Sequence, residues 1–441
     1  MVAHAMHLTR RILALAVPAF AALIAQPLML LADTWVAGYL GTASLAGLGV
    51  GSALLNTITG LMIFLAYGST SVVSRQLGAG NRIRGLELGV QAMWLALVLG
   101  ALLAVVTWLA APWLAAGLGA EGAVLAEAVS YLRWSLPGLP GMLAMLAATG
   151  TFRGLSDART PLVLLIGSAL VNLLLNIAFV FGLGSGLGGV GLALALAEML
   201  LGGVAWWLVG RRCRAAGARL APSFPEMRRS LAVGTPLLLR TVTLRVALLV
   251  TTYVATAQGT VALASHHVVM QVWGLLAYAL DALAIAGQTI IGLALGAGNK
   301  TEARSSTRLM TVWAVSGGAL LGLAAIGARV PIASFFAPED AVATMVARLL
   351  VIVGLTLPLA GYVYLLDGVL IGAGDGPYLA KAGVITLAVY APAALGALLM
   401  QPGAGGLTWL WVSFTVGFMG ARAVTLGVRA RGDGWMRLGA R

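Results

Sequence analysis

Twelve long apolar segments run through this 441-residue chain and constrain its fold more than any other feature. Most hold about twenty or more residues, the length that an α-helix needs to cross a bilayer. They do not alternate between polar and apolar residues, so they are typical of helices and not of barrel strands. We predict an all-α, polytopic membrane protein with spans at roughly 10–35, 43–70, 88–110, 122–150, 159–182, 188–210, 229–256, 262–290, 304–328, 340–368, 379–400 and 405–428.

The charge of the chain supports this topology. Only 9% of residues are charged, 60% are hydrophobic, and the formal net charge is +13. Most of the 27 Lys and Arg residues fall in the connections on the side that holds both termini. By the positive-inside rule we expect that side to be cytoplasmic. The excess charge then indicates contact with anionic membrane lipids and no binding of nucleic acid.

The sequence lacks the residue patterns of an enzyme or a metal site. No nucleophile–base pair, phosphate loop or His–Glu–x–x–His motif is present, and the one cysteine, Cys213, allows no disulfide framework. His266 and His267 are adjacent, so they point apart on a helix and do not indicate a metal site. The first apolar segment is too long for a cleavable signal. We expect no enzyme activity and no cofactor, and we expect any transport to be driven by an ion gradient.

The two halves of the chain repeat at a constant offset of 218 residues. An even number of six spans in each half means that both halves enter the membrane in the same direction, which is a parallel repeat. We predict an N-lobe at 1–210, a cytoplasmic linker at 211–228 and a C-lobe at 229–441. The register aligns Pro18 with Pro236, Gly41 with Gly259, Asp157 with Asp375, and Leu-Gly-Ala-Gly-Asn at 77–81 with the same motif at 295–299.

Asp33 is the main candidate for a functional residue. It is the only ionisable residue between Ile12 and Val36, and a carboxylate at membrane depth costs about 2.5–3.5 kcal/mol on insertion scales. Burial disfavours the charged form, so Asp33 would be poised to bind and release a proton or to neutralise a small cation. The alternative is that Asp33 lies near the outer end of its helix and is simply hydrated. Gln26 argues against it, because it lies two turns earlier on the same helix face.

Further polar residues lie within the predicted spans of the first half. Asn172 and Asn176 share a helix face, and their amides could hydrogen-bond a carboxylate and supply oxygens to a cation. They could also only join helices. Glu198 either shares the protonation role or is a neutral buried acid. The candidates are Asp33, Asn172, Asn176 and Glu198 for cation coupling, and Gln26, Asn56 and Thr149 for substrate binding.

The second half carries a different set of charges. Asp33 aligns with Thr251 and Asn172 with Tyr390, so the N-lobe acid has no counterpart there. Because buried charges must pair, we predict a structural charge network, with a role in gating as the alternative. Its members are Arg240, Arg245, Asp281 and Asp367.

At these residues the chain resembles the multidrug and toxic compound extrusion (MATE) family, in its DinF-like branch. The segments that carry the resemblance are Asp33-Thr-Trp-Val-Ala-Gly, Gln76-Leu-Gly-Ala-Gly, Leu239-Arg240-Thr, Ala277-Tyr-Ala-Leu-Asp281-Ala and Tyr364-Leu-Leu-Asp367-Gly. The resemblance implies two six-helix lobes and export of cationic or amphipathic drugs and other xenobiotics in exchange for H⁺ or Na⁺. It also implies that Asp33 is the coupling carboxylate, that Gln26 accompanies it and that Pro18 is a hinge.

The chain departs from that branch at two positions. Asn176 stands where the branch has Asp, and Leu194 stands where it has Thr, so the resemblance favours H⁺ over Na⁺ here. We expect a monomer in the inner (plasma) membrane of a bacterium. A flippase of lipid-linked substrates is the alternative among transporters, although few basic residues are available to line its cavity. A receptor or scaffold that transports nothing is the alternative from another class.

Overall fold

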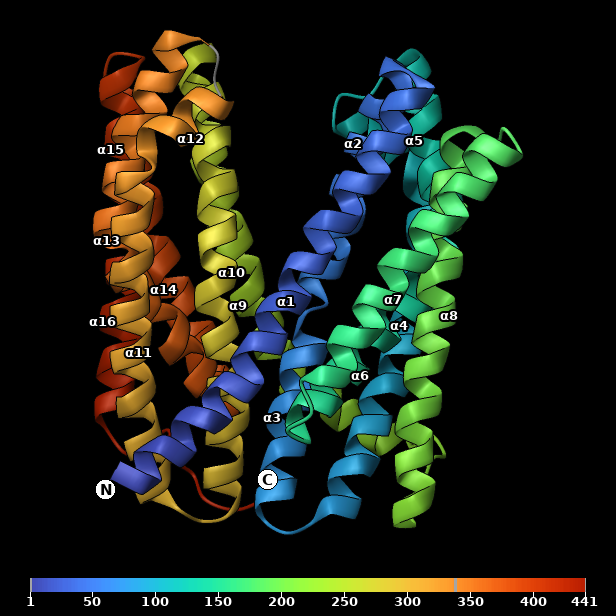
Figure 1. Ribbon diagram of the computed structural model, residues 1–441, viewed down its shortest axis with the longest axis vertical. Helices are drawn as coiled ribbons and strands as arrows, with labels where there is room; N and C mark the ends of the chain where they lie inside the picture. Colours follow the sequence, from blue (N-terminus) through green and yellow to red (C-terminus); the bar gives the residue numbers. More distant parts are fainter. Residues whose placement is uncertain (1, 337–338, 441) are drawn as a thin grey trace. The chain divides into compact units, whose positions relative to one another are not determined.

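The computed structural model describes residues 2–336 and 339–440, and every regular element in these ranges is a helix. Eleven stretches of the described chain are long and apolar enough to cross a membrane. The remaining predicted span, 122–150, is divided among α5 (Gly122–Ser135), the short helix η1 (Leu136–Gly138) and α6 (Leu139–Gly154). Proline near the start of η1 and of α6 accounts for the interruption, since it cannot donate a backbone hydrogen bond. Helices therefore occupy all twelve predicted spans (Figure 1).

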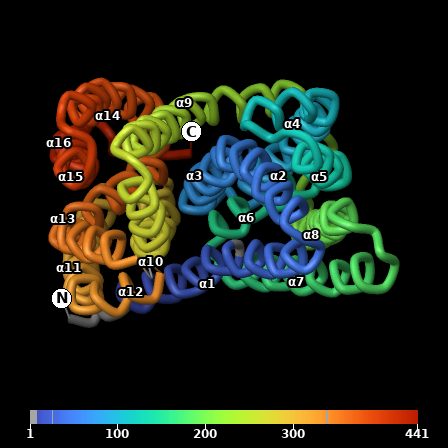
Figure 2. Tube along the Cα trace, turned by 90° about the horizontal axis from the view of Figure 1, so that it is seen from above, coloured from blue at the N-terminus to red at the C-terminus, as the bar shows by residue number. Residues whose placement is uncertain are grey.

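One compact unit, which we call the N-terminal unit, runs from Val17 to Thr235. Within it, α6 packs against α3, α4, α7 and α8, and Figure 2 shows α6 among these helices. The unit contains most of α1 (Val2–Leu40), then α2 (Thr42–Leu61), α3 (Phe64–Gly78), α4 (Arg82–Gly117), α5, η1, α6, α7 (Arg159–Asn176), the π-helical turn η2 (Ile177–Gly182), α8 (Gly186–Ala216) and the start of α9 (Phe224–Ala257).

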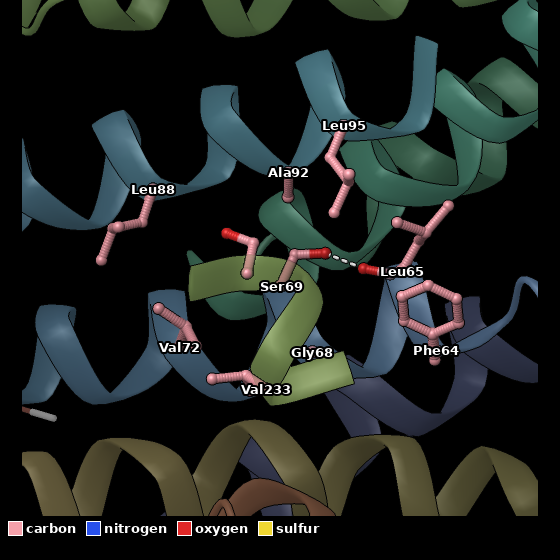
Figure 3. A pocket seen from close by; sticks show the side chains of 10 residues that line it. Phe64, Leu65, Gly68, Ser69, Val72, Leu88, Ala92, Leu95 and Val233 are labelled. Atoms are coloured by element: carbon pink, nitrogen blue, oxygen red, sulfur yellow. Dashed lines mark hydrogen bonds between the residues drawn. The ribbon is translucent and has the colours of Figure 1, made fainter. Parts of the chain in front are cut away.

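The segment that follows α8 is fastened along α4. Trp94 donates its indole N–H to the carbonyl of Leu220 at 2.9 Å, and Arg84 forms an ion pair with Glu226 at 2.5 Å. Beyond this segment, Val233 of α9 lines a pocket together with apolar side chains of α3 and α4, and Val72 of α3 lies near it (Figure 3). The first turns of α9 therefore belong to the N-terminal unit.

The second compact unit, the C-terminal unit, holds Pro236–Gly439 together with the residues of α1 up to Ala16. Its central helix is α13, which packs against α10, α11, α12 and α16. The unit contains the rest of α9, then α10 (Thr260–Gly296), α11 (Lys300–Gly327), α12 (Arg329–Phe336), α13 (Asp340–Gly372), α14 (Gly376–Leu395), η3 (Gly396–Leu399), α15 (Ala404–Val412), the π-helical turn η4 (Ser413–Phe418) and α16 (Met419–Arg431).

The backbone reproduces the repeat that the sequence predicts. Gly41 and Gly259 both have positive φ, at 117° and 98°, so the turn after the first helix of each half needs glycine at the same place. The division between units falls just before Pro18 in α1 and at Pro236 in α9, the aligned prolines. The predicted limits of the lobes, at 210 and 229, remain predictions.

Each half of the chain has an ion pair at the aligned aspartates Asp157 and Asp375. Arg212 donates to Asp157 at 2.5 Å, and in the other half Arg429 donates to the aligned Asp375 at 2.7 Å. Burial alone would raise the pKa of Asp157, but hydrogen bonds from Thr160 and Arg212 outweigh burial and lower the pKa. Asp157 lies between α6 and α7, and its carboxylate therefore stabilises that turn in its charged form.

Candidate functional site

Asp33 lies in α1, is only 2% exposed, and is held by two amides from α7. Asn172 and Asn176 each donate their Nδ2 to the same carboxylate oxygen, Oδ1, at 2.7 Å. Both asparagines are fully buried. The sequence marks all three as candidates for cation coupling, with contact between helices as the alternative for the asparagines, and the structure brings the three side chains together. We call Asp33, Asn172 and Asn176 the carboxylate–amide cluster.

The hydrogen bonds of this cluster are of the stronger kind. A neutral donor on a charged carboxylate contributes about 1.5–3 kcal/mol, so two of them offset much of the cost of burying the charge. The side-chain oxygens of the two amides, Oδ1 of Asn172 and of Asn176, are buried and have no hydrogen-bond partner within the described part of the chain. Such unpaired buried acceptors are uncommon in folded proteins and often mark functional sites. The buried ring of Tyr131, from α5, lies within electrostatic reach of Asp33.

Glu198 lies in the same unit, in α8, and is 6% exposed. The hydroxyl of Ser168 donates to its Oε1 at 2.9 Å. Ser168, Asn172 and Asn176 follow one another at four-residue steps in α7, so one face of this helix holds both Glu198 and Asp33. Glu198 is therefore hydrogen-bonded to α7, the helix that also holds Asp33.

The sequence predicts three residues that bind substrate. Asn56 is exposed on α2, and Thr149 is buried in α6. Neither of them hydrogen-bonds to the carboxylate–amide cluster in the described residues. Gln26 lies in α1, but its side chain is outside the described part of the structure. A role in substrate binding remains a prediction for all three.

The C-terminal unit holds a buried carboxylate of another kind. Asp367 of α13 accepts a hydrogen bond from Nε of Arg240 at 3.0 Å and one from Nη2 of Arg422 at 2.8 Å. A further bond joins Arg240 and Asp367 through their Nη2 and Oδ2 atoms. All three side chains are buried. This carboxylate is fully paired with permanent cations, in contrast to Asp33.

The predicted network has two more members, Arg245 and Asp281. Arg245 is exposed on α9, and no ion pair joins it to another described residue. Asp281 is half-buried on α10, and the charges of both residues reach Tyr278. The hydrogen bonds and ion pairs given above join Arg240, Asp367 and Arg422. The predicted set lacks Arg422, because the charge pattern assigns it to the cytoplasmic side.

The position that corresponds to Asp33 in the C-terminal unit carries a neutral hydrogen bond. Thr251 aligns with Asp33 and Tyr390 with Asn172, and the hydroxyls of Thr251 and Tyr390 lie 2.5 Å apart. Both residues are fully buried. The corresponding pair of helices is therefore in contact in both units, α1 with α7 and α9 with α14. Only the pair in the N-terminal unit includes a carboxylate at this position.

Several residues near these sites are absent from the set drawn from the sequence. Ser168 could have been found, because it continues the four-residue spacing of Asn172 and Asn176. Tyr131 and Arg422 lie in segments whose pattern does not mark them, and only packing brings them to Asp33 and Asp367. In the described ranges no group of three or more His, Cys, Asp or Glu side chains could hold a metal ion.

Comparison with known proteins agrees with this architecture. A family model described as MatE matches residues 18–178 and 236–394, the two halves of the repeat. DNA damage-inducible protein F of Escherichia coli (strain K12) is 29% identical over 429 residues, which cover 93% of this chain and 90% of that protein. Protein DETOXIFICATION 44, chloroplastic, of Arabidopsis thaliana is 28% identical over 390 residues, covering 85% and 74%.

Among solved structures, the fold is similar to that of the Vibrio cholerae MATE transporter VcmN in the bent form. The TM-score is 0.87, the sequence identity is 21%, and the match covers 97% of this chain and 98% of that one. At this identity the likeness concerns the fold alone.

Proposed function

Because the chain belongs to the MatE family of membrane transporters, which are not enzymes, we propose that it is a secondary multidrug antiporter. It exports cationic or amphipathic organic compounds, and inward proton movement drives the export. Relatives such as the multidrug resistance protein MdtK of Klebsiella pneumoniae, 29% identical over 310 residues, support the substrate class by their names. The coupling carboxylate is Asp33.

One observation carries this proposal, namely the environment of Asp33. Its carboxylate is buried and held by two neutral amides, and no ion pair joins it to a cation among the described residues. A carboxylate that is stabilised only by neutral donors can take up a proton without leaving a buried cation unpaired. Asp367 is less suited to this role, because protonation would remove the carboxylate charge with which both Arg240 and Arg422 form ion pairs. Asp33 is therefore the better proton carrier of the two.

The orientation of the amides favours H⁺ over Na⁺. Both asparagines turn their N–H groups, not their oxygens, toward Asp33. Sodium is bound by oxygen atoms, so a sodium ion beside Asp33 would require both amides to turn over. A proton on Oδ2 leaves both hydrogen bonds to Oδ1 in place. The carboxylate–amide cluster therefore fits a proton as it stands.

In the proposed cycle, Asp33 is charged while substrate is bound. A proton that enters from outside neutralises Asp33. Its hydrogen bonds from Asn172 and Asn176 remain but lose their charge assistance, and this weakening allows α1 to bend at Pro18. A ligand shifts a conformational equilibrium only through different affinities for the two states. The proton must therefore bind Asp33 more tightly in one conformation than in the other.

We place the protein in a bacterial inner membrane as a monomer with both termini in the cytoplasm. The distribution of Lys and Arg supports this orientation. Transport of lipid-linked anionic substrates is less well supported, because the buried Arg240 and Arg422 are both bound to Asp367. The coupling ion is the part of the proposal that most needs a test.

Efflux from proteoliposomes with one ion gradient at a time tests the coupling ion. A fluorescent organic cation is loaded, and either a pH gradient or a sodium gradient is imposed at constant membrane potential. We expect efflux with the pH gradient and only the leak rate with sodium. Efflux driven by sodium alone would assign the cluster to Na⁺, and efflux with neither gradient would refute secondary antiport.

A further inference from the structure

The buried acids of this protein differ in what balances their charge. Asp367 has two guanidinium partners, and Asp33 has two amides. Glu198 has a single hydrogen bond, from the hydroxyl of Ser168, and the described residues offer it no cation. A buried carboxylate with so little compensation is costly unless a positive charge or a proton reaches it. Its environment therefore favours uptake of a proton or contact with a positively charged ligand.

A recess in the N-terminal unit gives such a ligand a place beside Glu198. Three methionines from α1 and α6, namely Met29, Met142 and Met145, line it together with Glu198 and Ser168. Its free volume is about 30 Å³. This space holds a water molecule or an ammonium group but not a whole drug. We call it the methionine recess.

Close packing of α6 on α8 fixes the recess. A Cβ atom on Gly141 would lie 2.6 Å from the backbone carbonyl oxygen of Glu198, and one on Gly202 would lie 2.6 Å from the carbonyl of Gly141. Only glycine allows the two backbones to approach this far. The carboxyl group of Glu198 is therefore held against α6, beside Met142 and Met145, by a rigid contact and not by a mobile loop.

The lining suits the charged end of an amphipathic molecule. Methionine side chains are unbranched and polarisable, so they adapt to apolar groups of different shape. A carboxylate at the end of such a surface supplies one strong, charge-assisted hydrogen bond to an ammonium N–H. The apolar body of the molecule would remain at the edge of the recess, because the volume admits only its charged end. Methionines with one buried acid thus favour organic cations of varied shape.

We propose that Glu198, Ser168 and the methionine recess form a subsite that binds the ammonium end of an organic cation, separate from the proton site at Asp33. The proposal rests on the proposed export of organic cations and specifies which residue recognises their charge. Ser168 is a positioning residue, because its hydroxyl holds one oxygen of Glu198 and leaves the other for the ligand. Asp33 keeps its own hydrogen bonds to Asn172 and Asn176 when the subsite is filled.

Equilibrium binding to the detergent-solubilised full chain tests the subsite without any gradient. The probe is a dansyl amphiphile with a primary ammonium end, and its control is the same amphiphile with a hydroxyl end. Glu198→Gln keeps the size of the side chain and removes its charge. We expect this variant to bind the ammonium probe roughly tenfold more weakly or worse, and the hydroxyl probe within about twofold of the unmodified protein.

Two further variants complete the experiment. Glu121→Gln removes an exposed acid at the start of α5 and should change neither affinity. Ser168→Ala should weaken the ammonium probe by about threefold, since it removes one hydrogen bond to Glu198. If Glu198→Gln does not yield folded protein, Ser168→Ala tests the proposal instead. Weaker binding of the ammonium probe alone supports the subsite. Affinities for both probes that equal those of the unmodified protein overturn it.

The remaining outcomes are also decisive. Equal affinity of Glu198→Gln and the unmodified protein for the ammonium probe would overturn the subsite. If that variant binds the ammonium probe with unchanged affinity and releases fewer protons per probe bound, Glu198 is a second proton site and not a substrate site. Binding that depends on Glu198 in a protein without proton-driven efflux would support the subsite while refuting the proposed coupling.

Discussion

Replacing Gly202 by alanine tests the packing that holds the N-terminal unit together. The new Cβ would lie 2.6 Å from the carbonyl oxygen of Gly141 and 2.9 Å from its Cα, both closer than real Cβ atoms approach. Neither neighbour is a flexible side chain, so α6 and α8 must separate. Overpacking of this kind costs about 1–3 kcal/mol. The better helix propensity of alanine returns about 0.5–1 kcal/mol, so Gly202→Ala should be destabilising overall.

The next residue in the chain provides the matched control. A Cβ on Gly203 meets nothing within 4 Å, so Gly203→Ala receives the propensity gain without the clash. Thermal unfolding in one detergent, followed by intrinsic fluorescence or by size-exclusion of heated samples, measures both variants. We expect the Tm of Gly202→Ala to lie below that of Gly203→Ala by roughly 2–4 °C for each kcal/mol of difference. Equal Tm values, or a more stable Gly202→Ala, would refute the close contact between α6 and α8.

Two further predictions concern ion pairs. Asp367→Asn should destabilise the C-terminal unit by about 3–5 kcal/mol, because it leaves the guanidiniums of Arg240 and Arg422 buried beside a neutral amide; thermal unfolding measures the loss. Folding lowers the pKa of Asp157 below that of an aspartate in an unfolded chain. The stability from its contact with Arg212 is therefore present above the unfolded pKa and is lost as the pH falls through the lower, folded pKa. The Tm difference between the unmodified protein and Asp157→Asn should therefore stay constant from pH 7 to about 5 and shrink only as the pH falls below about 4.

A different result would contradict each of these two predictions. For the first, Asp433→Asn is the control, because Asp433 pairs with Arg304 on the surface and its loss should change stability by about 0–1 kcal/mol. A loss no larger for Asp367→Asn than for this control would contradict the buried pairing. For the second, a Tm difference between the unmodified protein and Asp157→Asn that does not change with pH would show that the carboxylate charge does not stabilise the turn.

The sequence predicts the helices of this fold well, because span length and hydropathy alone set where a chain can cross a bilayer. The four-residue spacing also predicts that Asn172 and Asn176 share one helix face, and contact of both amides with a carboxylate is one of the two alternatives that it leaves open. The repeat aligns Thr251 with Asp33 and Tyr390 with Asn172, but the sequence does not predict that these two residues meet. Thr251 and Tyr390 occupy the aligned positions and are in contact.

The sequence is less informative about partners that come from distant helices. Arg422 looks like one more basic residue near the C-terminus, and only the packing of α16 on α13 places it on Asp367. Arg245 has the pattern of a network member, yet it is exposed on α9. A helix face can be predicted from spacing, but the neighbour that this face meets depends on how the helices pack.

The central claim is that Asp33 carries the coupled proton, and one measurement tests it most directly. The full chain and its Asp33→Asn variant are reconstituted in liposomes, and proton movement is recorded with an internal pH dye while an organic cation is added. We predict substrate-dependent proton movement for the unmodified protein and none above the leak for Asp33→Asn, with both proteins folded. Proton movement of equal size in the variant would contradict the account.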